Sequence, residues 1–251
     1  MLEIKNLHAE LVEEELKIIK DFSLNLEKGK VHAIMGPNGS GKSTLSKLIA
    51  GDENYEVTSG SIQLNGDDVL DMDATQRALA GIFLAFQYPV EIPGVNNAEF
   101  LRMAYNAKQK HLGNIEVDPI EFNTILMKKI EQLNIPEEFL ERELNFGFSG
   151  GEKKRNEILQ LAVLNPKVAI LDETDSGLDI DALKQVSEAI NTLKNNDNTF
   201  LLITHYQRLL DYIEPDYVHI MIDGKIVQTG DKNLAKELDT KGYDHLLSAK
   251  A

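Results

Sequence analysis

The chain has 251 residues, of which 42% are hydrophobic and 27% are charged, a composition typical of an ordinary globular protein. Its 26 Lys and Arg residues against 41 Asp and Glu residues give a net charge of −15. An acidic surface of this kind repels phosphate backbones, so we expect no nucleic-acid partner.

No apolar run approaches the roughly 20 residues that a membrane-spanning helix requires. The N-terminal stretch MLEIKNLHAELVEEE lacks the basic and then apolar pattern of a signal peptide, so we expect no direct membrane insertion. The sequence contains no cysteine, which excludes disulfides, thiolate metal sites and a cysteine nucleophile. We therefore expect a cytosol-like compartment, and both the cytoplasm and a plastid stroma fit.

Short apolar runs rich in β-branched residues predict buried strands along the chain, and we expect them in a parallel sheet covered on both faces. These runs are VHAIM (31–35), IFLAF (82–86), VAIL (168–171) and FLLIT (200–204). Residues 3–12 and 60–65 indicate half-buried, antiparallel strands. Asp223-Gly224 lies between apolar stretches within residues 219–230 and predicts a β-hairpin.

Between about residues 96 and 145 the pattern becomes helical, in the segments 98–112, 119–133 and 136–144. We therefore predict an α/β fold with a mostly parallel core sheet, an antiparallel β subdomain and an inserted α-helical subdomain. The chain forms a single domain in this prediction. The predicted boundaries are 1–95 and 159–232 for the core, 96–158 for the helical subdomain and 233–251 for a C-terminal helical tail.

The stretch MGPNGSGKST (35–44) fits the phosphate-loop pattern G-x-x-x-x-G-K-[ST], and it lies between a predicted strand and a helical segment as that motif requires. Its glycines let backbone N–H groups converge on phosphate oxygens, and the helix N-terminus adds a favourable dipole. We expect Lys42 to neutralise the β- and γ-phosphates of ATP and the Ser43 hydroxyl to ligate Mg²⁺. The predicted phosphate-binding residues are Gly36, Pro37, Asn38, Gly39, Ser40, Gly41, Lys42, Ser43 and Thr44.

The segment VAILDET (168–174) places a carboxylate pair just past the C-terminal end of a buried strand, where ligands bind in open α/β sheets. We expect Asp172 to hold Mg²⁺ through water and Glu173 to orient or deprotonate the attacking water. Such a pair is commonly only a loop or a helix cap, but the phosphate loop upstream favours the catalytic interpretation. The following DSGLD (175–179), taken alone, indicates a turn with an aspartate as a helix cap.

The stretch FSGGE (148–152) holds two adjacent glycines at a predicted helix start. Glycine is a poor helix former, which costs about 1 kcal/mol against alanine in a helix interior. A capping box between Ser149 and Glu152 explains the serine and the glutamate but leaves the glycine pair unexplained. Bare backbone at a helix end suits a phosphate group, and one phosphate loop already wraps one nucleotide. We therefore predict a head-to-tail homodimer in which Ser149, Gly150, Gly151 and Glu152 of each copy cover the ATP of the other.

Six elements in order resemble the ABC-type ATPases: MGPNGSGKST, a glutamine after a strand (Gln87), FSGGE, VAILDE, SGLD and a histidine after a strand (His205). This resemblance implies that Gln87 senses Mg²⁺ and the nucleophilic water and that His205 contacts the γ-phosphate. It further implies that Asp179 joins the nucleotide site and communicates across the dimer. The implied catalytic residues are thus Glu173, His205 and Gln87, and the implied Mg²⁺ ligands are Ser43, Gln87 and Asp172.

Four longer segments resemble, more narrowly, the ATPases of the SUF iron–sulfur cluster assembly system. They are FQYPVEIPGV (86–95), GFSGGEKKRNEILQ (147–160), DSGLDIDALK (175–184) and THYQRLLDYI (204–213). The resemblance implies an ATPase whose ATP-driven dimerisation changes the conformation of SufB- and SufD-like scaffold proteins. A chain without cysteine cannot hold a cluster through thiolates, so the cluster belongs on a partner. We expect the helical block to contact the scaffold.

The sequence departs from the common ABC pattern at two places. Phe148 and Glu152 stand where most ABC ATPases have leucine and glutamine, as in the SUF-type proteins. Residues 11–17, LVEEELK, offer no aromatic side chain to stack on adenine, so we expect an aliphatic side chain such as Val12 to pack on the base.

The main alternative is the nucleotide-binding subunit of an ABC membrane transporter, whose ATP site would have the same residues. The segment 86–95 and the helices after it favour the SUF role. A clamp on DNA or ribosomes would need a long coiled coil or two fused cassettes, which the sequence lacks. The presence of Asp172, Glu173 and His205 disfavours a binding module without hydrolysis.

Overall fold

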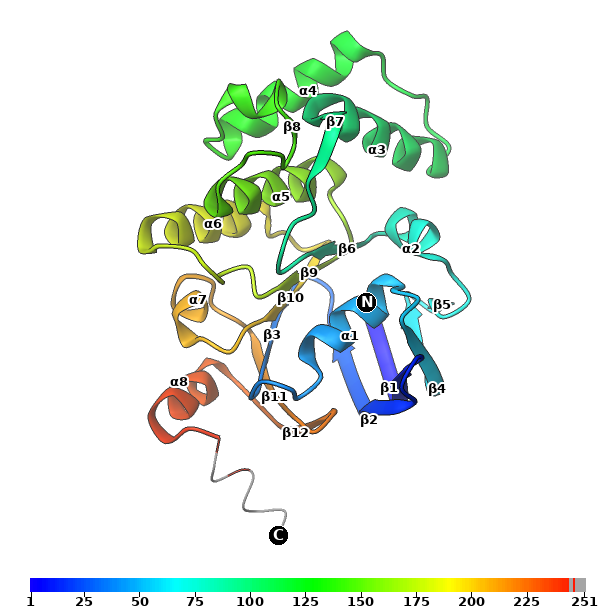
Figure 1. Ribbon diagram of the computed structural model, residues 1–251, viewed down its shortest axis with the longest axis vertical. Helices are drawn as coiled ribbons and strands as arrows, with labels where there is room; N and C mark the ends of the chain where they lie inside the picture. Colours follow the sequence, from blue (N-terminus) through cyan, green and yellow to red (C-terminus); the bar gives the residue numbers. More distant parts are fainter. Residues whose placement is uncertain (244–245, 247–251) are drawn as a thin grey trace. The chain divides into compact units, whose positions relative to one another are not determined.

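The computed structural model describes residues 1–243 and residue 246, and its contacts divide the chain into two compact units (Figure 1). Unit 1 comprises residues 1–86, 167–174 and the described part of 194–251, and unit 2 comprises residues 87–166 and 175–193. In the described part of the chain, no helix is both long and apolar enough to cross a membrane.

Unit 1 is built on a six-stranded sheet in the order β12–β11–β3–β10–β9–β6, in which only β12 pairs antiparallel with its neighbour. Its strands are β3 (Val31–Met35), β6 (Ile82–Ala85), β9 (Val168–Asp172), β10 (Thr199–Ile203), β11 (Tyr217–Ile222) and β12 (Lys225–Gly230). Every residue of β3, β9 and β10 is buried, as expected for parallel strands covered on both faces. The parallel core and three of the four predicted buried strands are thereby confirmed. The fourth, β6, is parallel as well, but it ends at Ala85, and its two middle residues are half-buried.

The turn between β11 and β12 has positive φ at both central residues, 50° at Asp223 and 79° at Gly224. Two such residues form the tight turn that the sequence predicts for this hairpin. Glycine is required at the second position because a Cβ there would lie 2.1 Å from the carbonyl oxygen of Ile18. The Gly224 N–H donates to the carbonyl of Ser40 at 3.0 Å, so the hairpin supports the predicted phosphate loop.

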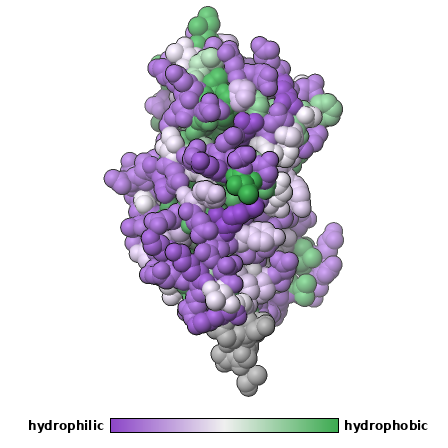
Figure 2. All heavy atoms as spheres, turned by 90° about the vertical axis from the view of Figure 1, so that its left-hand side faces the viewer, coloured by the Kyte–Doolittle hydropathy of each residue, from purple (hydrophilic) through white to green (hydrophobic). Residues whose placement is uncertain are grey.

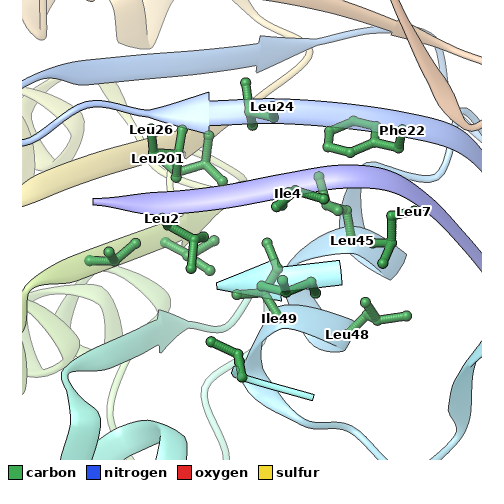
Figure 3. Packing of buried hydrophobic residues seen from close by; sticks show 14 of the residues in the cluster. Leu2, Ile4, Leu7, Phe22, Leu24, Leu26, Leu45, Leu48, Ile49 and Leu201 are labelled. Carbon is green, nitrogen blue, oxygen red and sulfur yellow. The ribbon is translucent and has the colours of Figure 1, made fainter. Parts of the chain in front are cut away.

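A four-stranded antiparallel sheet in the order β2–β1–β4–β5 forms the rest of the core of unit 1. Its strands are β1 (Leu2–Leu11), β2 (Leu16–Leu26), β4 (Tyr55–Leu64) and β5 (Asp67–Asp68). Helix α1 (Lys42–Ala50) contributes Leu45, Leu48 and Ile49 to a cluster with side chains of β1 and β2 (Figure 3). The same cluster includes Leu201 of β10, so α1 is packed against both sheets.

Three further helices complete unit 1: α2 (Ala74–Ala80), α7 (Gln207–Tyr212) and α8 (Lys232–Lys241). Helix α8 forms most of the described part of the predicted C-terminal tail, and residues 244–245 and 247–251 of that prediction lie outside the described residues. On the face that Figure 2 shows, hydrophilic side chains cover most of the surface and apolar ones gather in small groups, in keeping with the net charge of −15.

Unit 2 is mainly helical and includes residues 175–193, which lie within the predicted core segment 159–232. Its elements are α3 (Asn97–His111), α4 (Pro119–Gln132), α5 (Gly150–Leu164), α6 (Ile180–Leu193), the 3₁₀ turn η1 (Glu137–Leu140) and the paired strands β7 (Ile92–Asn96) and β8 (Glu143–Leu144). The prediction of a helix over residues 136–144 is wrong. So short a segment gains little helix stability of its own, and Phe139, Leu140 and Leu144 are buried from a 3₁₀ turn and a strand instead.

Two buried histidines of unit 1 form a hydrogen-bonded chain across the edge of the parallel sheet. The Glu27 N–H donates to His32 Nε2 at 3.1 Å, so Nδ1 of His32 carries the proton that it donates to His219 Nε2 at 3.1 Å. His219 Nδ1 in turn donates to Thr229 Oγ1 at 2.9 Å. Burial lowers the pKa of both imidazoles from 6.5 to about 4, because a charged ring here would lose its water.

We expect this pair to make folding stability sensitive to mild acid. Each folded pKa lies below the unfolded value of 6.5, so the stabilisation is complete above pH 6.5 and is lost as the pH falls toward 4. The loss at pH 5 should be on the order of 2 kcal/mol for each histidine. Urea unfolding between pH 7.5 and pH 4.5 measures it, and His219→Gln, which cannot titrate, should flatten the dependence; an equally steep slope in that variant would contradict the assignment.

Candidate active site

The predicted phosphate loop connects β3 to α1 and is fixed on strand β11. A Cβ at Gly36 would lie 2.1 Å from the carbonyl oxygen of Met221, so only glycine fits at this close approach. Gly41 precedes the helix with a φ of 99°, a conformation that other residues rarely adopt. The loop therefore opens directly onto the N-terminus of α1, where backbone N–H groups have no partner within the helix and can bind phosphate oxygens.

The Lys42 side chain is buried and bends back over the loop. Its Nζ donates to the carbonyl of Gly36 at 2.8 Å and to that of Pro37 at 3.0 Å. An ammonium group has three N–H donors, so the third is available for a phosphate oxygen. Burial lowers the pKa of Lys42, while the charges of Glu173 and Asp172 oppose that shift.

Asp172 ends strand β9 and is held by two hydroxyl groups of helix α1. Ser46 Oγ donates to Oδ2 at 2.7 Å, and Ser43 Oγ donates to Oδ1 at 3.2 Å. Burial raises the pKa of Asp172, and these two hydrogen bonds oppose that rise. Ser46 was not predicted as a site residue, although its position three residues after Ser43 on one helix face could have indicated it.

The donor set around Asp172 fits a magnesium ion. Magnesium prefers carboxylate and hydroxyl oxygens and usually keeps water and substrate phosphates as further ligands. Ser43 and Asp172 supply two oxygens of this kind, 3.2 Å apart. Within the described residues, no group of three or more His, Asp or Glu side chains could hold a metal by itself, so phosphates and water would have to complete the shell.

Glu173 follows Asp172 in a strained backbone conformation. Its φ of 44° is unusual for a residue with a side chain, and its N–H donates to the carbonyl of Ile203 at 2.8 Å. Its Oε1 lies 3.3 Å from Nδ1 of His205, which follows strand β10. The turn thus brings a partly buried carboxylate and an imidazole together beside the phosphate loop of the same unit.

Most of the predicted residues of unit 2 lie at helix starts, and Gln87 lies in a loop. Ser149 caps α5 in a capping box with Glu152, in which the Ser149 N–H donates to Glu152 Oε2 at 2.6 Å. This backbone hydrogen bond from Ser149 is the main reason why the pKa of Glu152 is lowered. Asp179 Oδ1 accepts from the Ala182 N–H at 2.8 Å and caps α6. Gln87 is half-buried in the loop after β6.

The glycine pair of α5 has no role in the chain's own fold. Neither Gly150 nor Gly151 has a positive φ. A Cβ at Gly150 would meet no atom within 4 Å, and one at Gly151 would be in ordinary contact with Ala182 at 3.5 Å. Alanine would therefore fit at both positions, and it is a better helix former than glycine.

The predicted site residues fall into two groups. Unit 1 brings together Lys42, Ser43, Asp172, Glu173 and His205 through the contacts described above. The other predicted phosphate-loop residues, within 36–44, also lie in unit 1. Unit 2 contains the predicted residues Gln87, Ser149, Gly150, Gly151, Glu152 and Asp179. Their roles at a nucleotide stay predictions.

Comparison with known proteins decides the family. A family model described as ABC transporter matches residues 19–176, which is more than half of the chain. The chain belongs to the ABC transporter family. As an ABC ATPase it binds nucleotide and hydrolyses ATP, as the resemblance of its motifs implied.

Individual relatives resemble this ABC ATPase over nearly its whole length. It is 53% identical to "Probable ATP-dependent transporter SufC" of Escherichia coli, over 98% of each chain. It is 59% identical to "Probable ATP-dependent transporter slr0075" of Synechocystis, over 98% of this chain and 95% of that one. It is 55% identical to "ABC transporter I family member 6, chloroplastic" of Arabidopsis thaliana, over 97% of this chain and 72% of that one. The predicted resemblance to the SUF-type ATPases is therefore confirmed by the similarity to SufC.

Solved structures confirm the predicted fold class. An ATP-binding subunit of an ABC transporter superposes with a TM-score of 0.78 at 25% identity, covering 99% of this chain and 98% of that one. The dimeric ATP-binding cassette MJ0796, in a post-hydrolysis state bound to ADP and Pi, has a TM-score of 0.79 at 21% identity, over 92% and 99% of the two chains. The second likeness shows the fold alone.

One further side chain at the phosphate loop of this ABC ATPase was not predicted. Tyr243 follows α8 and is half-buried. Burial raises the pKa of its phenol, and a hydrogen bond from the backbone of Gly36 lowers it. A single tyrosine in a polar C-terminal segment gives no sequence signal for such a contact.

We expect Ser46→Ala to lower the affinity for Mg²⁺ without abolishing the fold. The substitution removes the shorter of the two hydrogen bonds that orient Asp172. Loss of such an orienting partner typically costs 10- to 100-fold in metal affinity. Titration of ATPase activity with Mg²⁺ should therefore show at least a roughly 10-fold higher half-saturating concentration. Ser187→Ala is the control and should change nothing, because its buried hydroxyl has no hydrogen-bond partner among the described residues. Equal effects would reject the role of Ser46.

Proposed function

We propose that the chain is the ATP-hydrolysing subunit of a SUF iron–sulfur cluster assembly complex. The observation that carries this proposal is the 53% identity with SufC of Escherichia coli over 98% of both chains. The four segments that resemble SUF ATPases add support, since they extend beyond the residues that contact ATP in the predicted site. A cysteine-free chain fits this role because the cluster would be held by its partners.

The proposed ATPase centre is composite and requires two copies of the chain. Each copy would hold ATP·Mg²⁺ on its phosphate loop and receive Ser149, Gly150 and Gly151 from the other. Two glycines that the chain's own fold does not need support this arrangement. Asp179, close in sequence to the Asp172-Glu173 pair, would communicate between the two centres.

The roles proposed within one centre follow from its charges and contacts. Lys42 and the backbone N–H groups of residues 36–44 would hold the β- and γ-phosphates. Ser43, Asp172 and Gln87 would hold Mg²⁺, which when bound would neutralise charge on the phosphate oxygens. Glu173 would accept a proton from the attacking water.

His205 would act both on Glu173 and on the substrate. Its Nδ1 lies 3.3 Å from the Glu173 carboxylate and would fix the direction in which that base points. The other ring nitrogen, Nε2, would then be available to the γ-phosphate.

We further propose that the helical subdomain, residues 96–158, binds SufB- and SufD-like scaffold proteins. Exposed apolar side chains on α3 and α4 and the segment between them support a protein contact. These are Met103, Leu112, Ile115 and Ile120, with exposed fractions of 63%, 55%, 91% and 81%. The chloroplastic relative makes a plastid stroma as suitable a compartment as the cytoplasm.

The alternative is the nucleotide-binding subunit of a membrane transporter. Several relatives carry the name "Probable ATP-dependent transporter", which favours this second candidate. Purification of the chain with its native partners separates the two: scaffold proteins support the SUF role, and integral membrane proteins without a scaffold support the transporter.

We expect Glu173→Gln to separate ATP binding from turnover. The amide keeps the shape of the side chain but cannot take a proton, and removal of a general base typically costs 10²- to 10⁴-fold in rate. ATPase assays should show that loss, while equilibrium binding of ATP remains and an ATP-bound dimer accumulates in size-exclusion chromatography. Glu56→Gln, at an exposed glutamate of β4, should behave like the parent chain. Unchanged turnover in the Glu173 variant would remove this residue as the base.

We expect two inactive variants to restore each other if the centre is composite. Lys42→Ala disables the phosphate loop. Gly150→Asp puts a negative side chain where the γ-phosphate would lie, and its Cβ would meet no atom of the same chain within 4 Å. Each variant alone should lose at least about 100-fold in turnover. In an equimolar mixture, half of the dimers are mixed and one of their two centres is intact, so about a quarter of the parental activity should return. No recovery between folded, associating variants would refute the composite centre.

A further inference from the structure

Three buried asparagine side chains in unit 2 form a continuous hydrogen-bonded bridge, which we call the asparagine bridge (Asn97, Asn145 and Asn156). Asn97 lies at the start of α3, Asn145 precedes α5, and Asn156 lies within α5. Their exposed fractions are 0%, 3% and 0%. Asn156 Nδ2 donates to Asn145 Oδ1 at 2.9 Å and to Asn97 Oδ1 at 3.2 Å, and Asn97 Nδ2 donates to Asn156 Oδ1 at 2.7 Å.

Both ends of the asparagine bridge are anchored on backbone carbonyls. Asn145 Nδ2 donates to the carbonyl of Val90 at 2.8 Å, and Asn97 Nδ2 donates to that of Phe139 at 2.9 Å. Buried amides that satisfy one another in this way hold one arrangement of their elements, because any shift leaves polar groups without partners. The bridge therefore fixes the segment around Val90 to helix α5.

A second contact joins the same two segments. Lys153, in the second turn of α5, forms an ion pair with Glu91, the residue after Val90. Near the helix start, Arg142 bonds Glu152 and the carbonyl of Gly147 and lies 3.7 Å from the centre of the Phe148 ring. The start of α5, which carries Ser149 and the glycine pair, is thus held from several sides.

The segment 88–92, which the asparagine bridge anchors, is exposed and could contact a partner. The side chains of Tyr88, Val90 and Ile92 are 78%, 61% and 38% exposed, although all three are apolar or aromatic. The carbonyl of Val90 is tied to α5 through Asn145 and Asn156, while all three residues are exposed. A protein that binds these side chains would therefore act on α5 without touching it.

We propose that Asn145 and Asn156 are positioning residues that set the placement of Ser149, Gly150 and Gly151 by fixing α5 to the segment 88–92. This inference rests on the proposed function, since it assumes that the start of α5 serves the ATP of a second copy. The bridge would make the exposed segment and the glycine pair move as one body. Binding of a partner to residues 88–92 would then change the geometry of the neighbouring copy's ATPase centre.

The simpler alternative is that the bridge only stabilises unit 2. Asn106 provides a matched control, because it is also buried in unit 2 and also bonds backbone groups, at 2.9 and 3.0 Å to Val117. Its hydrogen bonds close the connection after α3 and do not reach α5. If loss of a buried amide matters only for stability, replacements of Asn106 and Asn145 should have the same consequences.

The test compares Asn145→Gly with Asn106→Ala in steady-state ATPase assays. Glycine suits position 145, where φ is 59°, so the substitution removes the amide without straining the backbone. We expect Asn145→Gly to lower kcat at least about 10-fold with little change in KM, because ATP is bound by the intact phosphate loop and the misplaced group belongs to the other copy. Asn156→Ala is measured beside it and should give the same pattern, while Asn106→Ala should stay within about 2-fold of the parent.

Mixing experiments locate the defect. Adding the Lys42→Ala chain, whose α5 is intact, should raise the turnover of the Asn145→Gly chain, because the mixed dimer contains one complete centre. An equal loss of kcat in Asn106→Ala, or a loss in Asn145→Gly without rescue by the Lys42→Ala chain, would overturn the inference. The proposed function fails separately, if the Lys42→Ala and Gly150→Asp variants do not restore each other.

Discussion

The hydrogen bonds from Ser43 and Ser46 to Asp172 join two parts of unit 1 that are both needed to bind a phosphate group. They tie helix α1, whose N-terminus can bind the phosphates, to the end of strand β9, which carries the carboxylate. The helix can supply both hydroxyls because residues three apart lie on one helix face. Leu45, Leu48 and Ile49 bury the opposite side of α1 among β1 and β2, so the helix cannot turn to relieve these bonds.

Strand β9 also determines where the proposed base stands. The chain leaves the sheet at Glu173 with a positive φ, a conformation that costs of order 1–3 kcal/mol for a residue with a side chain. The Glu173 N–H bond to Ile203 and the buried strands around it offset that cost. This conformation brings the Glu173 carboxylate next to His205. His205 follows β10, which pairs in parallel with β9, so the two side chains lie at the same edge of the sheet.

Much of this arrangement could be predicted from sequence because it depends on local patterns. Apolar runs predicted β3, β9 and β10, and the phosphate-loop spacing predicted the turn into α1. Residues 136–144 were predicted wrongly, since their apolar spacing suits a helix while burial of Phe139 is achieved from a 3₁₀ turn. The positive φ of Glu173 and the asparagine bridge depend on contacts distant in sequence, as between Val90 and Asn145, and no local pattern encodes them.

The glycine pair of α5 shows what a monomer structure can say about a partner. Every local reason for glycine is absent there, because neither residue needs a positive φ and a Cβ at either position would fit. The same helix start carries a complete capping box, which stabilises the helix. Its first turn nevertheless contains two glycines, and only proline is a poorer helix former. A locally unfavourable choice inside a locally optimised element is what the proposed composite centre would explain. In that centre the backbone of this helix end would come close to a phosphate of another copy, and the asparagine bridge would hold the helix end in place for it.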